Sequence, residues 1–457
     1  MRAFAAGICL PRCERNGRAP FSFMKTRLLL PLLLIAPLFG AAAPLNFVFG
    51  SRPAASGATA VSAGAVFSKT SDFGFEPGAA VTATADGVAS AQPFYFSAKL
   101  PAEGNYRVTV TFPGGTDATV KAELRRLMIE HVEVPAGKTA KRSFIVNTRT
   151  PKITAVGDIK EGVVKLKVPR ESVMEAWAWD DVLTLEFDGA HPAVGAIEIE
   201  PANVPTVFLI GDSTVCDQPK EPYSSWGQSF TRWFKPEVAI ANHAESGETY
   251  RDSIGRRRLD KMLSVMKPGD WMIMQFGHND QKQIAPGTGG PFTTYKAEIK
   301  THVDAVRAHG GTPIVVSPME RRNFDANAKI KPSLADYAKA SRDAAQELGV
   351  AFIDLNAMSI PFYEALEAHG PEFSRKAFAG QDNTHHDNYG SYELSKFIVQ
   401  AIRDQKLPLA KFIVEDFHSV DPAHPDDVAA FTLPPSPNFT NQRPLGDDSA
   451  APANSAK

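Results

Sequence analysis

The chain has 457 residues, an apolar fraction of 43% and a formal net charge of −2 at neutral pH. The length exceeds that of one ordinary domain, and the apolar fraction is sufficient for complete hydrophobic cores. The near-neutral charge excludes a general polyanion-binding protein, so we expect no nucleic-acid partner.

The first 43 residues have the features of a secretory signal peptide. A basic segment at 24–27 precedes an apolar run at 28–39, and small residues at 40–43 offer a cleavage site. The run is short and interrupted by proline, which does not favour a membrane-spanning helix. We expect translation to start at Met24, the alternative being a long basic leader. The predicted mature protein is bacterial and secreted or periplasmic, with no membrane partner.

Residues 44–200 predict an all-β domain. Short runs of alternating or β-branched residues are separated by Gly, Pro and Asn, without a helical period, which is typical of a β-sandwich. The expected strands are 94–98, 105–112, 121–129, 139–146, 163–168, 182–187 and 194–199. This pattern resembles the galactose-binding-like modules of polysaccharide enzymes. Tyr106, Trp177 and Trp179 offer faces for a sugar, although packing is the preferred interpretation.

In residues 205–415, apolar strands alternate with amphipathic helices. We expect strands at 206–210, 238–241, 271–275, 313–317 and 351–355, and helices at 225–234, 253–266, 295–309, 334–348 and 390–405. The alternation predicts an α/β fold, a three-layer αβα doubly wound parallel sheet of the flavodoxin type. Residues 416–457 are rich in proline and predict a partly disordered tail, in which the disorder is expected from Ser436 onward. The segment 412–431 is expected to pack onto the domain.

Four polar stretches follow predicted strands or precede the last helix. They are Gly-Asp-Ser-Thr at 211–214, the stretch 242–249, Gly-His-Asn-Asp at 277–280 and Asp-Asn-Thr-His at 382–385. Ligands of open α/β sheets bind at the carboxyl ends of the strands, so these stretches can meet at one edge.

Together the stretches offer the parts that acyl transfer requires. Ser213 is the candidate nucleophile, His385 the candidate base, and Asp382 the carboxylate that orients the base. The backbone N–H groups of Ser213 and Gly247 and the amide of Asn279 are candidate oxyanion donors.

In their order and spacing, these motifs resemble the SGNH (GDSL-like) hydrolase superfamily and, within it, the rhamnogalacturonan acetylesterase family. The resemblance covers residues 205–410 and includes the segment 317–324. It implies a serine esterase without metal or cofactor that removes acetyl groups from pectic polysaccharide. Gly-Glu-Thr at 247–249 departs from the Gly-Arg-Ser of many relatives, which affects substrate contacts more than the chemistry.

Several of these residues also have structural interpretations. Ser213 could cap a helix, and we expect Asp212 to hold the turn and His278 to orient its loop. His386 and Asp387 offer a competing base or, with His385, a metal cluster, and both alternatives are disfavoured. The single cysteine of the mature chain, Cys216, allows no internal disulfide, and we interpret it as a core residue.

Arginines near the predicted strand ends could bind the carboxylates of a pectic substrate. We assign Arg321 and Arg322 to substrate binding and interpret 256–258 as a solvated helix face. Two other functions remain open: an SGNH esterase acting on another acetylated glycan or on a lipid ester, and a non-catalytic carbohydrate-binding protein. The sequence does not predict the oligomeric state.

Overall fold

The computed structural model describes residues 43–51, 56–68, 70–283 and 287–437. The predicted signal peptide and the start at Met24 lie outside the described residues, apart from residue 43. The described residues belong to one compact unit. No helix in these ranges is long and apolar enough to cross a membrane.

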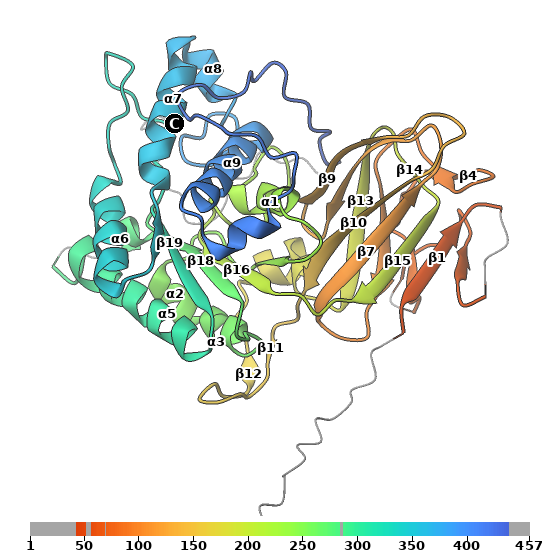
Figure 1. Cartoon of the computed structure of the whole chain (residues 1–457), viewed down its shortest axis with the longest axis horizontal. Helices are drawn as coiled ribbons and strands as arrows, with labels where there is room; N and C mark the ends of the chain where they lie inside the picture. The colour runs from red at the N-terminus through yellow and green to blue at the C-terminus, as the bar shows by residue number, and fades with distance from the viewer. Residues whose placement is uncertain (1–42, 52–55, 69, 284–286, 438–457) are drawn as a thin grey trace, which may run out of the picture. The chain divides into compact units, whose positions relative to one another are not determined.

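The first half of the chain is built of strands (Figure 1). These are β1 (Leu45–Phe49), β2 (Thr59–Val61), β3 (Phe73–Phe75), β4 (Thr82–Ala83), β5 (Val88–Ala89), β6 (Phe94–Lys99), β7 (Gly104–Phe112), β8 (Asp117–Ala122), β9 (Arg126–Glu133), β10 (Ala140–Thr148), β11 (Lys152–Ile153), β12 (Gly162–Val163), β13 (Val182–His191), β14 (Ala193–Val194) and β15 (Ala196–Pro201). Two short helical turns, η1 (Arg170–Met174) and η2 (Ala176–Ala178), precede β13.

Two five-stranded sheets dominate this half, with the orders β10–β7–β15–β1–β2 and β3–β6–β13–β8–β9. Alternate residues of β7, from Tyr106 to Phe112, are buried, as expected for a strand with one face on a core. Both sheets contribute to one hydrophobic core, in which Phe96 contacts the rings of Phe47, Phe49 and Phe75. Burial of one face of each sheet therefore explains the alternating pattern.

The predicted strand at 121–129 is wrong as a single element. β8 ends at Ala122 and β9 begins at Arg126, and the chain reverses between them. Glu123 and Arg125 adopt φ angles of 56° and 62°, which only a turn accommodates. The reversal contains no Gly, Pro or Asn, so the sequence carried no ordinary turn signal.

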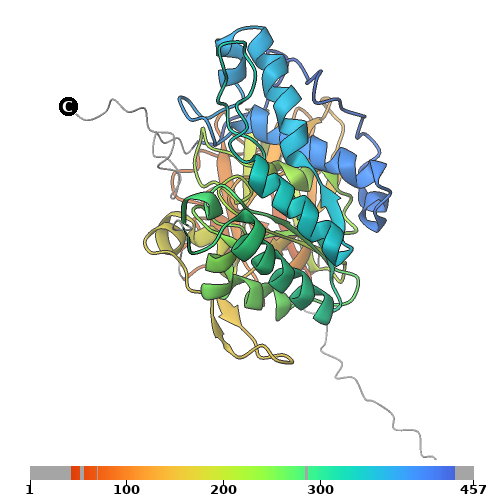
Figure 2. The same cartoon turned by 90° about the vertical axis from the view of Figure 1, so that its left-hand side faces the viewer.

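The second half contains a five-stranded parallel sheet flanked by helices (Figures 1 and 2). Its strands are β16 (Thr206–Gly211), β17 (Ala239–Asn242), β18 (Trp271–Gln275), β19 (Thr312–Val316) and β20 (Ala351–Ile353). The helices are α1 (Trp226–Phe230), η3 (Thr231–Trp233), α2 (Tyr250–Gly255), α3 (Arg258–Leu263), α4 (Asp280–Gln283), η4 (Pro291–Tyr295), α5 (Lys296–Ala308), α6 (Ala335–Leu348), α7 (Leu355–Ala368), α8 (Pro371–Arg375), α9 (Asn388–Asp404) and η5 (Pro408–Phe412).

The strand order β17–β16–β18–β19–β20 is the flavodoxin-like order 2-1-3-4-5, as predicted. Val207 and Leu209 of β16 enter a core shared with α1, α7 and α9, whereas Phe208 and Ile210 enter the core shared with α5 and α6. Burial on both faces explains the continuous apolar run of β16.

Two helical details differ from the sequence prediction. The helix expected at 253–266 is divided into α2 and α3, because Arg257 adopts a φ of 63° between them. Helix α7 was not predicted, although it is 14 residues long and is preceded by the capping residue Asp354. Pro361 lies inside α7, and such a residue ordinarily argues against a helix.

The described part of the tail packs against the molecule. The ring of Phe431 contacts Tyr389 and Tyr392 of α9, which fits the expectation that residues up to 431 pack. Ser436, the first residue of the segment expected to be disordered, is buried and accepts a hydrogen bond from Lys121 Nζ at 2.9 Å. Residues 438–457 lie outside the described ranges.

Candidate active site

The turn after β16 presents Ser213 at the carboxyl end of the sheet. Gly211 approaches β18 so closely that a Cβ atom would lie 2.5 Å from the carbonyl oxygen of Gln275. The carboxylate of Asp212 accepts hydrogen bonds from the backbone N–H of Thr214 at 2.9 Å and from its hydroxyl at 2.8 Å. Asp212 therefore holds the turn, as the sequence predicted.

Ser213, His385 and Asp382 form a continuous hydrogen-bonded line. His385 Nε2 lies 2.7 Å from Ser213 Oγ, and His385 Nδ1 lies 2.9 Å from Asp382 Oδ2. A carboxylate only accepts hydrogen bonds, so Nδ1 carries the proton and Nε2 is left to accept from the serine hydroxyl. All three residues are buried, although they are as many as 172 positions apart in sequence.

The loop before α9 fixes the carboxylate of Asp382. Its Oδ1 atom accepts hydrogen bonds from the backbone N–H groups of Thr384 at 2.8 Å and His385 at 3.0 Å. Burial alone would raise the pKa of Asp382, but the hydrogen bond and charge of His385 and these N–H groups lower it to about 2. Asp382 is therefore ionised at every pH at which an esterase would ordinarily act.

His386 and Asp387 are engaged away from Ser213. His386 Nε2 lies 2.8 Å from the hydroxyl of Tyr363, and its ring stacks on that side chain. Burial lowers the pKa of His386 to about 3, so its imidazole is neutral. Asp387 caps α9 by accepting a hydrogen bond from Gly390 N at 3.0 Å. The geometry thus favours His385 over His386 as the base.

Three loops meet around the serine. The N–H of Glu245 donates to the carbonyl of Gly211 at 3.0 Å, which joins the loop after β17 to the end of β16. Asn279 Nδ2 donates to the carbonyl of Glu248 at 3.1 Å, which joins the loop after β18 to the same segment. Gly247 has a φ of 72°, a conformation that favours glycine. The other two candidate oxyanion donors, the N–H of Gly247 and the amide of Asn279, therefore lie on loops that hydrogen bonds connect to the loop of Ser213.

His278 forms a second buried histidine–aspartate pair. Its Nδ1 lies 3.3 Å from Asp212 Oδ2, and its Nε2 lies 3.1 Å from the carbonyl oxygen of Met319. The charge of His278 and its hydrogen bond outweigh burial and hold the pKa of Asp212 below its usual value. His278 joins two loops of the site, in keeping with the predicted orienting role.

Arg321 and Arg322 are both buried against the protein. Arg321 Nη1 donates to Gln281 Oε1 at 3.0 Å, and Arg322 Nη2 donates to Asn383 Oδ1 at 2.8 Å. The backbone N–H of Arg322 also donates to the carbonyl of Asn383 at 2.8 Å. The contacts of Arg322 hold the loop that carries Asp382 and His385, and the contact of Arg321 joins its own loop to α4. Both favour a positioning role over the predicted binding of substrate.

Two side chains that the sequence did not single out also support the site. Gln218 Nε2 donates to the carbonyl of Ser213 at 2.7 Å. Arg170, which precedes β13 in sequence, donates to Glu245 Oε1 at 3.0 Å and to Ser246 Oγ at 2.9 Å. No spacing rule pairs residue 170 with residue 246, so only the folded chain reveals this contact.

The prediction of a solvated face at residues 256–258 is wrong for Arg258. This side chain is only 1% exposed and forms an ion pair with Glu171. Glu171, Glu175 and Glu245 also offer carboxylate oxygens within 4.8 Å of one another, an arrangement that could hold a metal ion. Arg170 lies 2.6 Å from Glu175 and 3.0 Å from Glu245, so guanidinium groups already balance this cluster.

The remaining sequence candidates have packing contacts. Trp179 is buried beneath the guanidinium of Arg149, 4.4 Å from the ring centroid, and the buried Tyr106 donates its hydroxyl hydrogen to the carbonyl of Ala102. Trp177 lies beside the ring of Tyr95. Cys216 is buried, and this burial raises the pKa of its thiol well above the usual value. These contacts favour structural roles.

Comparison with known proteins identifies the family. Residues 209–391 match the GDSL-like lipase/acylhydrolase family. The rhamnogalacturonan acetylesterase RhgT of Bacillus subtilis is 35% identical over 223 residues, which are 46% of this chain and 94% of the relative. The probable rhamnogalacturonan acetylesterase YesY of the same organism is 29% identical over 213 residues, 46% of this chain and 98% of the relative.

One solved structure, that of the YxiM protein from Bacillus subtilis, is similar over 80% of this chain and 99% of its own, with a TM-score of 0.43 and 21% identity. The sequence relatives, matched over nearly their whole length, carry the assignment. The chain belongs to the GDSL-like (SGNH) hydrolase family, resembles its rhamnogalacturonan acetylesterases, and is a carboxylic ester hydrolase.

Proposed function

We propose that this esterase removes acetyl groups from a pectic polysaccharide of the rhamnogalacturonan type, with Ser213 as the nucleophile. The observation that carries the chemistry is the line from Asp382 through His385 to Ser213, with distances of 2.9 and 2.7 Å. The substrate class is supported by the names of two relatives, both called rhamnogalacturonan acetylesterases.

The reaction proceeds in two acyl-transfer steps. His385 Nε2 accepts the proton of Ser213 Oγ as the oxygen attacks the acetyl carbonyl. The sugar hydroxyl leaves with the proton returned by His385, and an acetyl-serine remains. Water, deprotonated by the same nitrogen, then attacks the acetyl-serine and releases acetate. Asp382 stays ionised throughout and stabilises the imidazolium that forms in each step.

Charge develops on the carbonyl oxygen of the acetyl group in both steps. The N–H groups of Ser213 and Gly247 and the amide of Asn279 are the proposed donors to this oxygen. Their support is the hydrogen bonding that joins the three loops, from Glu245 to Gly211 and from Asn279 to Glu248. Such fixed donors stabilise an oxyanion without reorganising during the reaction.

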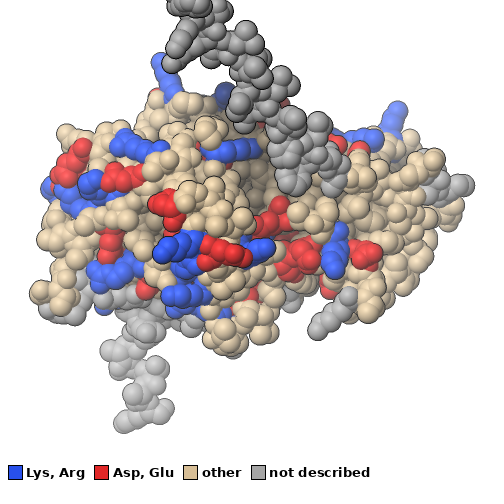
Figure 3. Space-filling view, turned by 90° about the horizontal axis from the view of Figure 1, so that it is seen from below, with Lys and Arg blue, Asp and Glu red and all other residues tan. Residues whose placement is uncertain are grey.

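We also propose a secreted or periplasmic location and a galactose-binding-like β-sandwich for residues 44–200. The first rests on the signal-peptide features of the leader, and the second on the two five-stranded sheets and their common core. Lys and Arg are interspersed with Asp and Glu on the face seen in Figure 3.

Acetate release from three substrates tests the proposal. Acetylated rhamnogalacturonan, acetylated xylan and p-nitrophenyl acetate are compared at equal acetyl concentration, with Ser213→Ala as the control for the nucleophile. We expect the highest kcat/KM on rhamnogalacturonan and no release by the variant. Faster release of acetate from acetylated xylan would indicate that the substrate is another acetylated glycan. Activity that survives Ser213→Ala would refute the mechanism, as would failure of a fluorophosphonate probe to label Ser213.

A further inference from the structure

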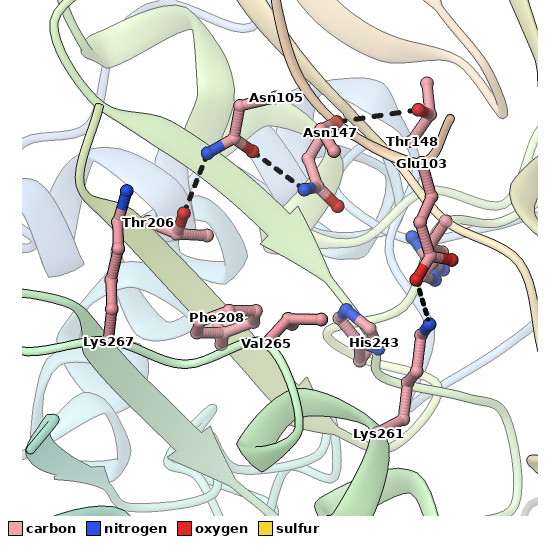
Figure 4. A pocket seen from close by; sticks show the side chains of 12 residues that line it. Glu103, Asn105, Asn147, Thr148, Thr206, Phe208, His243, Lys261, Val265 and Lys267 are labelled. Carbon is pink, nitrogen blue, oxygen red and sulfur yellow. Dashed lines mark hydrogen bonds and ion pairs between the residues drawn. The ribbon is translucent and has the colours of Figure 1, made fainter. Parts of the chain in front are cut away.

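A cavity of about 210 Å³ lies away from Ser213, between residues of β7 and β10 and residues of β16 and α3 (Figure 4). Its volume is many times the space of about 10–15 Å³ that holds one water molecule, so it has room for a ligand the size of a single sugar ring. Figure 4 shows polar side chains around its rim and the ring of Phe208 at one wall.

Arg149 is the most unusual group in this cavity. Its side chain is buried, and its Nε and Nη1 atoms have no hydrogen-bond partner among the described residues. The guanidinium stacks on Trp179, but no carboxylate of the described chain forms an ion pair with it. The charges of Asp217 and Glu123 act on this guanidinium without forming an ion pair with it, so a directly bound anion is missing. A ligand with a negative charge would supply that partner and offset the cost of burying the guanidinium.

Other groups make the cavity cationic. Lys261 and Lys267 line it with Arg149, and the one acidic residue of the lining, Glu103, already binds Lys261 at 2.6 Å. Burial and then the charges of Arg149 and Lys261 lower the pKa of His243 well below its usual value. His243 is therefore a neutral imidazole, and its Nδ1 atom has no hydrogen-bond partner within the described ranges.

The opposite side of the cavity offers fixed amide groups. Asn147 Nδ2 donates to Asn105 Oδ1 at 2.8 Å, and Asn105 Nδ2 donates to Thr206 Oγ1 at 2.9 Å. This chain of bonds sets the orientation of the Asn147 amide. Its Oδ1 atom is buried and accepts no hydrogen bond from the described residues, so it can accept one from a hydroxyl.

We propose that this cavity is a second binding site, which takes a single uronic-acid residue. The carboxylate pairs with Arg149, ring hydroxyls bond to Asn147 and His243, and the apolar face of the sugar contacts Phe208. Arginine recognises carboxylates through two parallel hydrogen bonds, which matches a uronate better than a neutral sugar. No acyl transfer occurs at this site, so the inference goes beyond the proposed function and stands without it.

Calorimetric titration of the full chain tests this site, with D-galacturonate, D-galactose and inorganic phosphate as ligands. We expect galacturonate to bind with one site per chain and at least about tenfold more tightly than the other two. Arg149→Gln should weaken this binding at least about tenfold. The exposed Arg142 provides a matched control, and Arg142→Gln should bind like the parent chain. Ser213→Ala should also bind unchanged, which separates this site from the esterase reaction.

A second variant tests the site independently, in case Arg149→Gln does not fold. Asn147→Asp places a carboxylate beside the proposed uronate and should also weaken the binding of galacturonate. Its unfolding midpoint, lowered by the loss of the hydrogen bond to Asn105, shows that the variant folds. Equal binding of galactose would refute recognition of the carboxylate, and tighter binding of phosphate would refute recognition of the sugar. The absence of saturable binding by the parent chain, or unchanged binding by folded Asn147→Asp, would overturn the site.

Discussion

Two buried histidine–aspartate pairs lie in the same half of this molecule, and they end on different atoms. His385 connects Asp382 with the hydroxyl of Ser213, whereas His278 connects Asp212 with the carbonyl oxygen of Met319. A hydroxyl can donate to an imidazole nitrogen, but a carbonyl oxygen only accepts.

This difference distinguishes His385, which can act as a base, from His278, which only supports the loops that it joins. The lone pair of His385 Nε2 faces a proton that can be removed. Both ring nitrogens of His278 face oxygen atoms that can only accept a hydrogen bond, so neither faces a proton that the imidazole could remove. Burial next to an aspartate is therefore insufficient evidence of catalysis, and the third group decides the role.

The largest effect is expected from paired histidine substitutions. His385→Ala should lower kcat by roughly 10⁶, because base and nucleophile activation are lost together. His278→Gln should leave measurable turnover in whatever fraction of the protein folds. Acetate release per mole of folded protein, with the folded fraction taken from urea unfolding of each variant, gives both values. A loss in His278→Gln as large as that in His385→Ala would abolish the distinction between the pairs.

Substitution of Asp382 should affect turnover, whereas substitution of Asp212 should affect stability. Asp382→Asn should lower kcat by roughly 10⁴, because the amide no longer holds the required tautomer of His385. Asp212→Asn should instead lower the free energy of unfolding by about 1–3 kcal/mol, because the buried groups of Thr214 and His278 lose a charged hydrogen-bond acceptor. Kinetics and urea unfolding on both variants measure the two effects. Equal kinetic losses would contradict the assignment of Asp212 to the turn.

Substitution of Asn279 tests whether the loop after β18 takes part in the same reaction as His385. Asn279→Ala should lower kcat by roughly 10²–10³ with little change in KM, since an oxyanion donor acts on the transition state. Steady-state kinetics on a soluble acetyl ester distinguish the two parameters. An unchanged kcat would remove Asn279 from the proposed oxyanion hole and leave it only its bond to Glu248.

The smallest effect is a dependence of stability on pH. The pKa of Asp382 falls from 3.8 to about 2 on folding, so its ionised form stabilises the native state above the unfolded pKa. This contribution, about 2 kcal/mol, should be complete above pH 5 and lost as pH falls from about 4 to 2. Urea unfolding of the parent chain and Asp382→Asn should therefore converge toward pH 2. A constant difference between them would show that the shift has another origin.

The sequence predicted the second half of the fold well and the first half less completely. All five parallel strands were expected within two residues of their observed ends, because strands buried on both faces are continuous apolar runs. The hairpin between β8 and β9 and helix α7 were missed. In both, local signals conflict with the structure: the hairpin turns without Gly or Pro, and the helix contains Pro361.

For the site, the four motifs were enough to select Ser213, Asp382 and His385, because each follows a strand or precedes a helix at the same edge of the sheet. The sequence could not exclude His386 as the base, since adjacent residues differ only in where their side chains point. The structure directs His386 to Tyr363 and Arg322 to Asn383. It also brings the side chain of Arg170, in η1, into contact with the loop that carries Gly247.

What the sequence determined by itself is the set of candidate reacting groups and the order of the strands that carry them, because local patterning and strand-end motifs are properties of short segments. What only the tertiary structure decided is the partner of each buried polar atom. Those partners lie far apart in the chain, and burial makes each unpaired polar atom costly. Close packing therefore brings one histidine to a serine hydroxyl and another to a backbone carbonyl. It also leaves Arg149 without an ion-pair partner among the described residues.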